Sequence, residues 1–275
     1  MEARFPLRGV IAATLTPFQS DGVPDAAKAI PYYGELLANG CGGLNLLGTT
    51  GEGVSIALAD RLAFMEAIAS SSLPRERLIV GTGAAALGDA IRLTRAAFDF
   101  GFAAALVIPP FYYRDASDAG IAAFYGALAD AVRPPEARLL LYNFPRMSGI
   151  TFTPELVAQV IEHCGSAIGG VKDSSNDPAL ESALHSRFPQ LAIYPGSETL
   201  LGEARERGFA GCISGSVCLW PQIAKRVWRD GDSAALEELT RARSALGQPL
   251  IAAVRKRVSA ARNDSGWLTS ALPLR

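Results

Sequence analysis

The sequence predicts a single (β/α)8 barrel, also called a TIM barrel, with additional C-terminal helices. Short apolar runs rich in strand-forming residues alternate with amphipathic helical stretches, and this alternation occurs eight times without a break in composition. A doubly wound sheet is the alternative, but it more often shows such a break or a point where the strand order reverses. We therefore predict a catalytic barrel over 1–232 and a helical extension packed on it over 233–275.

The predicted strands are short apolar runs followed by loops rich in Gly, Pro, Ser or Thr. They cover residues 10–15, 42–47, 78–81, 104–108, 138–142, 167–171, 192–194 and 211–214. Helical periodicity predicts helices that include 59–70, 89–100, 154–163 and 199–207. Gly40, Gly101 and Gly208 stand where glycines commonly end helices. Residues 233–262 are rich in Ala, Leu and Arg and are predicted to be helical, and the tail SGWLTSALPLR closes the chain.

Composition excludes several classes of protein. The 275 residues are 49% hydrophobic and 19% charged, which is ordinary for a globular protein that buries a full core. A net charge of −1 gives no reason to expect nucleic acid or a membrane surface as a partner. No signal peptide is recognised, and no apolar run approaches the ~18 residues that span a bilayer. The four cysteines form no CxxC pair and are predicted to be reduced core thiols, so cytoplasm is the default location.

In a barrel of this kind the chemistry lies where the strands end. The stretch GGVKDSSN places Lys172 directly after a buried apolar strand. Burial disfavours the ammonium form, and the free amine that results attacks ketones to form a Schiff base. The alternative is an ion pair between Lys172 and Asp173, or another carboxylate at the rim.

Two further strand ends offer polar groups. Tyr142 stands where the fifth strand meets its loop, so its phenol can reach across the barrel mouth as a proton donor or acceptor, or can line the barrel and bond to backbone. After the second strand, GTTGE combines Gly48 with the hydroxyls of Thr49 and Thr50, which suits a carboxylate or phosphate. The alternative for GTTGE is a tight turn with a helix cap.

The remaining strand ends carry weaker patterns. The aromatic loop PPFYYRD after the fourth strand can cover a site or fill a subunit contact. PGSET and SGSVCLWP, after the seventh and eighth strands, suit a phosphate or a hydroxylated substrate. Together, Lys172, Tyr142 and the two threonines provide an amine nucleophile, a proton shuttle and a carboxylate clamp. An enzyme that acts on a 2-oxo acid through a Schiff base needs these three groups.

The motifs GTTGE, YNFP, GVKDSS, PGSE and GCISGS, in this order, resemble the dihydrodipicolinate synthase/N-acetylneuraminate lyase family. Its members are class I aldolases and related lyases on a (β/α)8 barrel, typically tetramers. The resemblance implies a Schiff base between Lys172 and pyruvate or a larger 2-oxo acid, with no cofactor besides this covalent adduct. It implies Tyr142 as the general acid/base, and Thr49 and Thr50 as the binders of the carboxylate and the hydroxyl relay.

The resemblance also implies residues for substrate binding and assembly. A tyrosine of the loop after the fourth strand would enter a neighbouring subunit's site in a homo-oligomer, a tetramer or a dimer; Tyr112 matches best and Tyr113 second. Ile213 would present its backbone carbonyl near the bound keto acid. The predicted substrate-binding residues are Thr50, Gly48, Ile213, Gly196, Ser174 and Glu198.

The choice of substrate depends on departures from the family pattern. Dihydrodipicolinate synthases usually carry an arginine at the position of Met147, and often an asparagine at the position of Cys218. In this chain the arginine, Arg146, stands one residue earlier. The loops PPFYYRD and YNFPRMSG resemble 2-keto-3-deoxy sugar-acid aldolases more closely. We therefore predict a lyase that releases pyruvate and an aldehyde from a 2-keto-3-deoxy sugar acid or related 4-hydroxy-2-oxo acid.

Other functions stay open at this point. They are the dihydrodipicolinate synthase itself, an N-acetylneuraminate lyase, and a catalytically silent barrel that senses 2-oxo acids. For the N-acetylneuraminate lyase, Ser174 matches the hydroxyl after the lysine motif, and Glu198 provides one of the two acidic residues that follow the seventh strand in that enzyme. A metal-dependent aldolase is disfavoured because His163 and His185, the two histidines, fall in helical segments. An NAD enzyme is disfavoured because GTGAAA lacks the third glycine in register.

Overall fold

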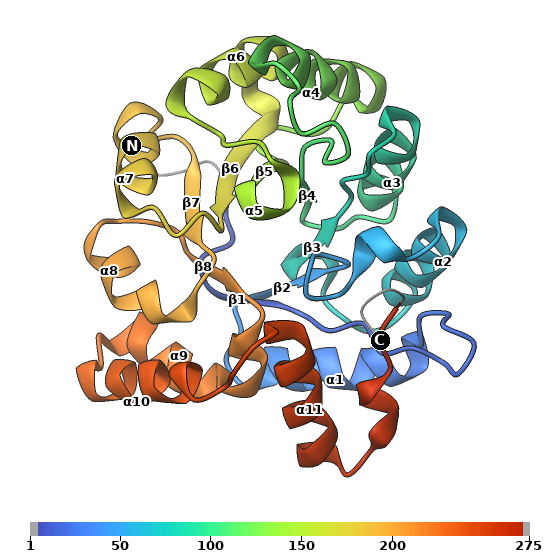
Figure 1. The fold of residues 1–275 in the computed structure, drawn as a ribbon, viewed down its shortest axis with the longest axis vertical. Helices are drawn as coiled ribbons and strands as arrows, with labels where there is room; N and C mark the ends of the chain where they lie inside the picture. The colour runs from blue at the N-terminus through green and yellow to red at the C-terminus, as the bar shows by residue number, and fades with distance from the viewer. Residues whose placement is uncertain (1–4, 272–275) are drawn as a thin grey trace.

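The computed structural model describes residues 5–271 and forms the predicted barrel (Figure 1). All eight strands are parallel, in the order β7-β6-β5-β4-β3-β2-β1-β8. The seam between β7 and β8 is bridged by a backbone hydrogen bond from Ala210 N to Ile193 O, 3.0 Å. The strands are β1 (Gly9–Ala13), β2 (Gly43–Leu46), β3 (Leu78–Gly81), β4 (Ala104–Val107), β5 (Leu139–Asn143), β6 (Ile168–Asp173), β7 (Ala192–Pro195) and β8 (Gly211–Ser214).

Helices surround the strands in a ring, as Figure 1 shows along its shortest axis. The α-helices are α1 (Ala26–Ala38), α2 (Leu58–Ala69), α3 (Leu87–Asp99), α4 (Asp118–Val132), α5 (Pro145–Ser148), α6 (Pro154–Cys164), α7 (Pro178–Arg187), α8 (Leu201–Glu206), α9 (Pro221–Asp230), α10 (Ser233–Ser244) and α11 (Leu250–Arg262). Short 3₁₀ turns are η1 (Gly53–Ser55), η2 (Arg75–Arg77), η3 (Gly165–Ala167), η4 (Glu198–Leu200), η5 (Ser216–Leu219) and η6 (Ser265–Leu268).

The predicted elements lie close to the observed ones, with one difference that matters for the site. Strand β6 continues to Asp173, so Lys172 lies inside the strand rather than after it. The cause is tertiary, because Tyr142 and Tyr194 on the two neighbouring strands pair with Lys172 and extend the ladder. The stretch predicted as helical over 233–262 is two helices, separated at Gly247, whose φ is +84°.

The barrel interior is filled by its own side chains. Inward-facing residues from alternate strand positions, among them Ile11, Ile79, Leu140 and Ile213, form one buried cluster. Two further clusters fill the space between the strands and the helices. Because the interior is packed, we expect the active site at the rim, where the carboxyl ends of the parallel strands meet.

The C-terminal helices share a core with the barrel. Leu239 of α10 and Val254 of α11 are buried in the same cluster as Tyr33 of α1. The division between barrel and extension at 232/233 stays a prediction. Residues 272–275 of the predicted tail lie outside the described residues.

The chain shows no disulfide between its four cysteines, of which Cys41, Cys212 and Cys218 are buried and Cys164 is partly buried. Over residues 5–271, none of the helices has both the length and the apolar character needed to cross a membrane.

Candidate active site

Lys172 and Tyr142 lie side by side at the rim of the barrel. They are Cα partners in the ladder between β5 and β6, so both side chains project to the same face of the sheet. Tyr142 belongs to the cluster that fills the barrel interior, so this face is the inner one. Each residue is 4% exposed, and Lys172 Nζ lies 4.1 Å from the centroid of the Tyr142 ring. The amine is therefore held against an aromatic face at the barrel mouth.

Lys172 does not pair with Asp173. Successive residues of a strand face opposite sides, so Asp173 points outward. Its carboxylate accepts hydrogen bonds from Ser175 Oγ (2.7 Å), from Ser175 N (3.2 Å) and from the Asn143 side-chain amide. Within residues 5–271, no carboxylate forms an ion pair with Lys172. The ion-pair alternative is therefore not realised, and the lysine has no competing charge partner there.

The loop after β2 supplies a hydroxyl to Tyr142. Thr49 Oγ1 and the Tyr142 phenol oxygen lie 3.1 Å apart, and either can donate. Thr50 is 8% exposed and packs under the loop after β8, where a Cβ on Gly215 would lie 2.6 Å from Thr50 Oγ1. Gly48 begins the turn, and its carbonyl accepts a hydrogen bond from Gly53 N at 3.1 Å. The ends of β2, β5 and β8 thus meet around one point.

The ends of β6 and β7 join the same rim. Ser174 donates its backbone N–H to Asn143 O at 2.8 Å, which continues the register between β5 and β6. A Cβ on Gly196 would lie 2.5 Å from Ser174 Oγ, so only glycine allows these loops to approach so closely. Ile213 lies on the inner face of β8, fully buried.

Glu198 is bonded within the fold. It is fully buried, accepts a hydrogen bond from Ser216 Oγ at 2.5 Å and another from Ser214 Oγ, and forms an ion pair with Arg243 of α10 at 3.8 Å. Ser214 alternates with the inward Ile213, so this carboxylate lies toward the outer face of β8. A role of Glu198 in substrate binding stays a prediction.

Tyr112 and Tyr113 point away from the rest of the chain. They are 76% and 72% exposed, with ring centroids 5.1 Å apart in an edge-to-face pair. Met147 is 44% exposed. It follows Arg146 on the helical turn α5, so this segment is not an extended loop. Both tyrosines therefore lie outside the core of the chain, and their entry into a neighbouring subunit's site stays a prediction.

One inward residue was missed in the sequence. Asn45 pairs with Ala13 and Ile79 in the β1–β2 and β2–β3 ladders, so it faces the barrel interior. It is fully buried, and neither polar atom of its amide has a hydrogen-bond partner among residues 5–271. A polar residue in the apolar run GLNLL was the signal that could have marked it.

A pair of carboxyl groups lies on the outer side of β6. Asp173 and Glu181 of α7 are 1% and 4% exposed. Burial raises the pKa of Asp173, and burial together with the nearby Asp173 charge raises the pKa of Glu181 to about 8. Near neutral pH this pair therefore retains a proton directly behind the lysine-bearing strand.

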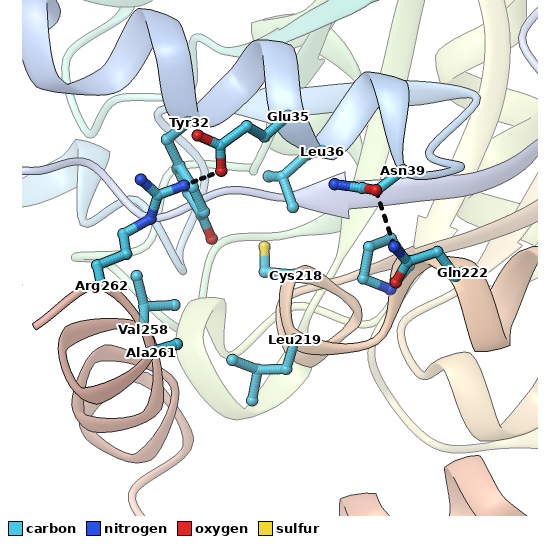
Figure 2. Close-up of a pocket in the computed structure, with 11 residues that line it drawn as sticks. Tyr32, Glu35, Leu36, Asn39, Cys218, Leu219, Gln222, Val258, Ala261 and Arg262 are labelled. Carbon is cyan, nitrogen blue, oxygen red and sulfur yellow. Dashed lines mark hydrogen bonds and ion pairs between the residues drawn. The ribbon is translucent and has the colours of Figure 1, made fainter.

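The remaining polar clusters do not form a second centre at the rim. Within residues 5–271, no group of three or more His, Cys, Asp or Glu is arranged to hold a metal ion, and His163 and His185 lie in α6 and α7 as predicted. A groove of about 550 Å³ lies between α1, η5 and α11, on the side of the barrel (Figure 2). Cys218 lines this groove, and its thiol contacts Ala13 O at 3.6 Å.

Fold and site together define a barrel enzyme with its polar groups at the carboxyl ends of the strands. The model of the dihydrodipicolinate synthetase family matches residues 6–261, and the chain belongs to this family. The resemblance predicted from the sequence is thus confirmed, and with it the class of enzyme, a lyase of the pyruvate-dependent aldolase type.

Individual relatives agree with this assignment. The chain is 40% identical to an uncharacterized DapA-like lyase of Chloroflexus aurantiacus over 84% of this chain and 78% of the relative. The solved dihydrodipicolinate synthase of Agrobacterium tumefaciens is 29% identical, with a TM-score of 0.88 over 97% of this chain and 93% of its own. YagE, a prophage protein of E. coli K12 solved in complex with pyruvate, is 26% identical, with a TM-score of 0.84 over 98% and 92%.

Proposed function

We propose that the protein cleaves a 2-keto-3-deoxy sugar acid, or a related 4-hydroxy-2-oxo acid, into pyruvate and an aldehyde, or forms the same bond in reverse. Lys172 is the Schiff-base residue and Tyr142 the general acid/base. The observation that carries the proposal is the row of three groups at the rim, in which Tyr142 contacts Lys172 with its ring and Thr49 with its hydroxyl. An amine, a proton relay and an anion-binding loop then surround one ketone.

The reaction balances without an oxidant or a reductant. Lys172 Nζ attacks C2 of the ketone, a proton reaches the C2 oxygen, and water leaves to give an iminium ion. Loss of the C4 hydroxyl proton breaks the C3–C4 bond, whose electron pair moves to C3 as the iminium becomes an enamine. The aldehyde departs, C3 takes a proton, and water at C2 releases pyruvate. Tyr142, bonded to Thr49, carries the protons at each of these steps.

The substrate class follows from the loop after β5. Met147 offers no charge where a semialdehyde carboxylate would need one. The principal alternative is 4-hydroxy-tetrahydrodipicolinate synthesis, because a dihydrodipicolinate synthase is among the relatives solved. The pyruvate bound to YagE supports pyruvate as the common half of either reaction.

Borohydride reduction in the presence of pyruvate tests the mechanism. We expect one reduced pyruvate unit on Lys172, located by peptide mass spectrometry, and the same yield with EDTA present. Lys172→Arg should lose the adduct and Lys28→Arg should keep it, since Lys28 is ion-paired at the surface with Asp264. An adduct that is absent, lies on another lysine or requires a metal ion contradicts the proposal.

The proposal includes two features of the whole enzyme. A homo-oligomer, a tetramer or a dimer, would give the exposed Tyr112 and Tyr113 a partner surface. A cytoplasmic location fits four free cysteines, since thiols persist in reducing compartments.

A further inference from the structure

The carboxylate-binding loop after β2 ends in a buried carboxylate of its own. Glu52 is 1% exposed and adopts a left-handed backbone conformation with φ +56°. Its amide N donates to Thr49 O at 3.0 Å, so its position fixes the turn that carries both threonines. A non-glycine residue in this conformation costs free energy and persists when its surroundings hold it.

The partner of Glu52 comes from the C-terminal helices. Arg255 of α11 is 1% exposed and donates from Nε to Glu52 Oε1 at 2.8 Å, with Nη2 directed at the same oxygen. The other carboxylate oxygen accepts the backbone N–H of Ala271 at 2.7 Å. Both oxygens of Glu52 are therefore bound by residues that follow the eighth strand by some 40 to 60 positions.

Arg255 also donates hydrogen bonds to the backbone of two other segments, one after β1 and one after α11. Nη2 donates to Thr16 O at 2.9 Å and Nη1 to Trp267 O at 3.2 Å. Thr16 in turn donates its hydroxyl to Gly51 O at 2.7 Å, inside the loop itself. All three nitrogens of the guanidinium are used, which is the condition under which a buried ion pair compensates for its desolvation.

A second arginine–glutamate pair lies at the other side of the site, with Glu198 fully buried and the Arg243 side chain 23% exposed. Arg243 of α10 forms an ion pair with Glu198 after β7 and donates to Ser216 after β8. The turn that contains Ser216 also carries Gly215, which packs against Thr50. The two helices of the extension thus each place one arginine against a loop of the candidate site.

From this arrangement we infer that Arg255 is a positioning residue for substrate binding, which acts through Glu52 to hold Thr49 and Thr50 in the geometry that receives the substrate carboxylate. The C-terminal extension is then part of the binding machinery rather than a cover for the barrel. The inference rests on the proposed function where it assigns the carboxylate to these threonines.

Three conservative variants test the inference. Glu52→Gln removes the carboxylate charge at nearly constant size, and Arg255→Lys keeps the positive charge but removes the guanidinium whose three nitrogens bind Glu52, Thr16 and Trp267. Arg262→Lys is the matched control, because Arg262 lies on the same helix and pairs with Glu35 of α1 at the groove (Figure 2). Each variant is assayed for kcat and KM with the 2-oxo acid, for the Lys172 adduct, and for amide hydrogen exchange over 47–53.

We expect Glu52→Gln and Arg255→Lys to raise the KM about 10- to 100-fold, since displacing a binding group by one ångström costs up to about 10²-fold. At saturating pyruvate, Lys172 should still be trapped fully, and amides 47–53 should exchange faster. Arg262→Lys should match the parent in all three measurements. If Glu52→Gln does not fold, Arg255→Lys, which keeps both charges, decides the question.

Two results separate the possible failures. A lower melting temperature with unchanged KM and unchanged exchange over 47–53 would show that the pair only stabilises the fold, and would overturn the inference. A parent enzyme that forms no adduct, while the variants still loosen 47–53, would refute the proposed function and leave the positioning of the loop standing.

Discussion

Tyr142 lies between Lys172 and Thr49, with the lysine amine 4.1 Å from its ring centroid and the threonine hydroxyl 3.1 Å from its phenol oxygen. The first contact follows from the pairing of β5 with β6, and the second from the turn after β2. One side chain therefore joins the residue that would form the covalent bond to the residue that would relay the protons.

Tyr142→Phe should lower kcat by about 10²–10⁴-fold, as the loss of one general acid/base does. The ring still packs beside Lys172, so the KM for the 2-oxo acid should change little. Tyr125→Phe is the control, because its hydroxyl is also buried but bonds to Val107 O at 2.8 Å outside the barrel. Steady-state kinetics check both variants. Equal losses in the two, or a loss confined to KM, would remove Tyr142 from the proton relay.

Met147→Arg should create weak condensation of pyruvate with aspartate semialdehyde, because it restores the arginine that the resemblance to dihydrodipicolinate synthases implies for a second carboxylate. Met147 is 44% exposed, so the substitution should leave folding intact. The parent should cleave a 2-keto-3-deoxy sugar acid and condense the semialdehyde poorly or not at all. Met147→Leu serves as the uncharged control. Efficient semialdehyde condensation by the parent in a coupled assay would place the protein in the synthase branch of the family.

Stability should depend on the carboxyl pair behind β6. Between the ordinary pKa of glutamate, 4.5, and the raised value of about 8, the folded protein keeps the Glu181 proton that the unfolded chain has lost. The unfolded state binds fewer protons in this window, so the free energy of unfolding falls as pH rises. The buried Asp173, whose pKa is also raised, acts in the same direction.

Glu181→Gln should make the free energy of unfolding fall less steeply with pH. Relative to the parent, the variant should therefore be most stabilised near pH 8. Urea unfolding midpoints measured from about pH 5 to about pH 8 test this. Glu155→Gln removes an exposed carboxylate whose pKa is lowered by its own backbone N–H and by Arg187, so it should leave the slope unchanged. Parallel curves for parent and Glu181→Gln would mean that the pair does not share a retained proton.

Tyr112→Ala should lose activity without losing stability, because the side chain is 76% exposed in the single chain. If the ring completes a neighbouring subunit's site, mixing Tyr112→Ala with Lys172→Ala subunits should restore activity, since some mixed assemblies then contain an intact pair. Tyr113→Ala, at the second candidate for the same role, is mixed with Lys172→Ala in a parallel experiment. Subunit exchange that is verified by mass, yet yields no activity, would assign Tyr112 a role outside the site.

The barrel and the polar groups at its rim were predictable because both depend on local patterns. Eight strand–helix alternations require parallel strands, and parallel strands in a barrel bring their carboxyl ends to one rim. The sequence predicts Lys172, Tyr142 and Thr49 at or just after strand ends, so motifs far apart in sequence were expected to converge there. Their contacts in the structure agree with that expectation.

What the sequence determined by itself is therefore the architecture and the convergence of Lys172, Tyr142 and Thr49 at one rim. Only the tertiary structure decided how those residues are held. Asp173 points outward because β6 extends through it. Glu198 forms a hydrogen bond with Ser216 and an ion pair with Arg243 instead of facing an open site. Arg255 reaches Glu52 across 203 positions. No sequence periodicity predicts a contact between residues so distant. The contact forms only when the C-terminal helices pack on the closed barrel, where a buried charge requires a partner of opposite charge.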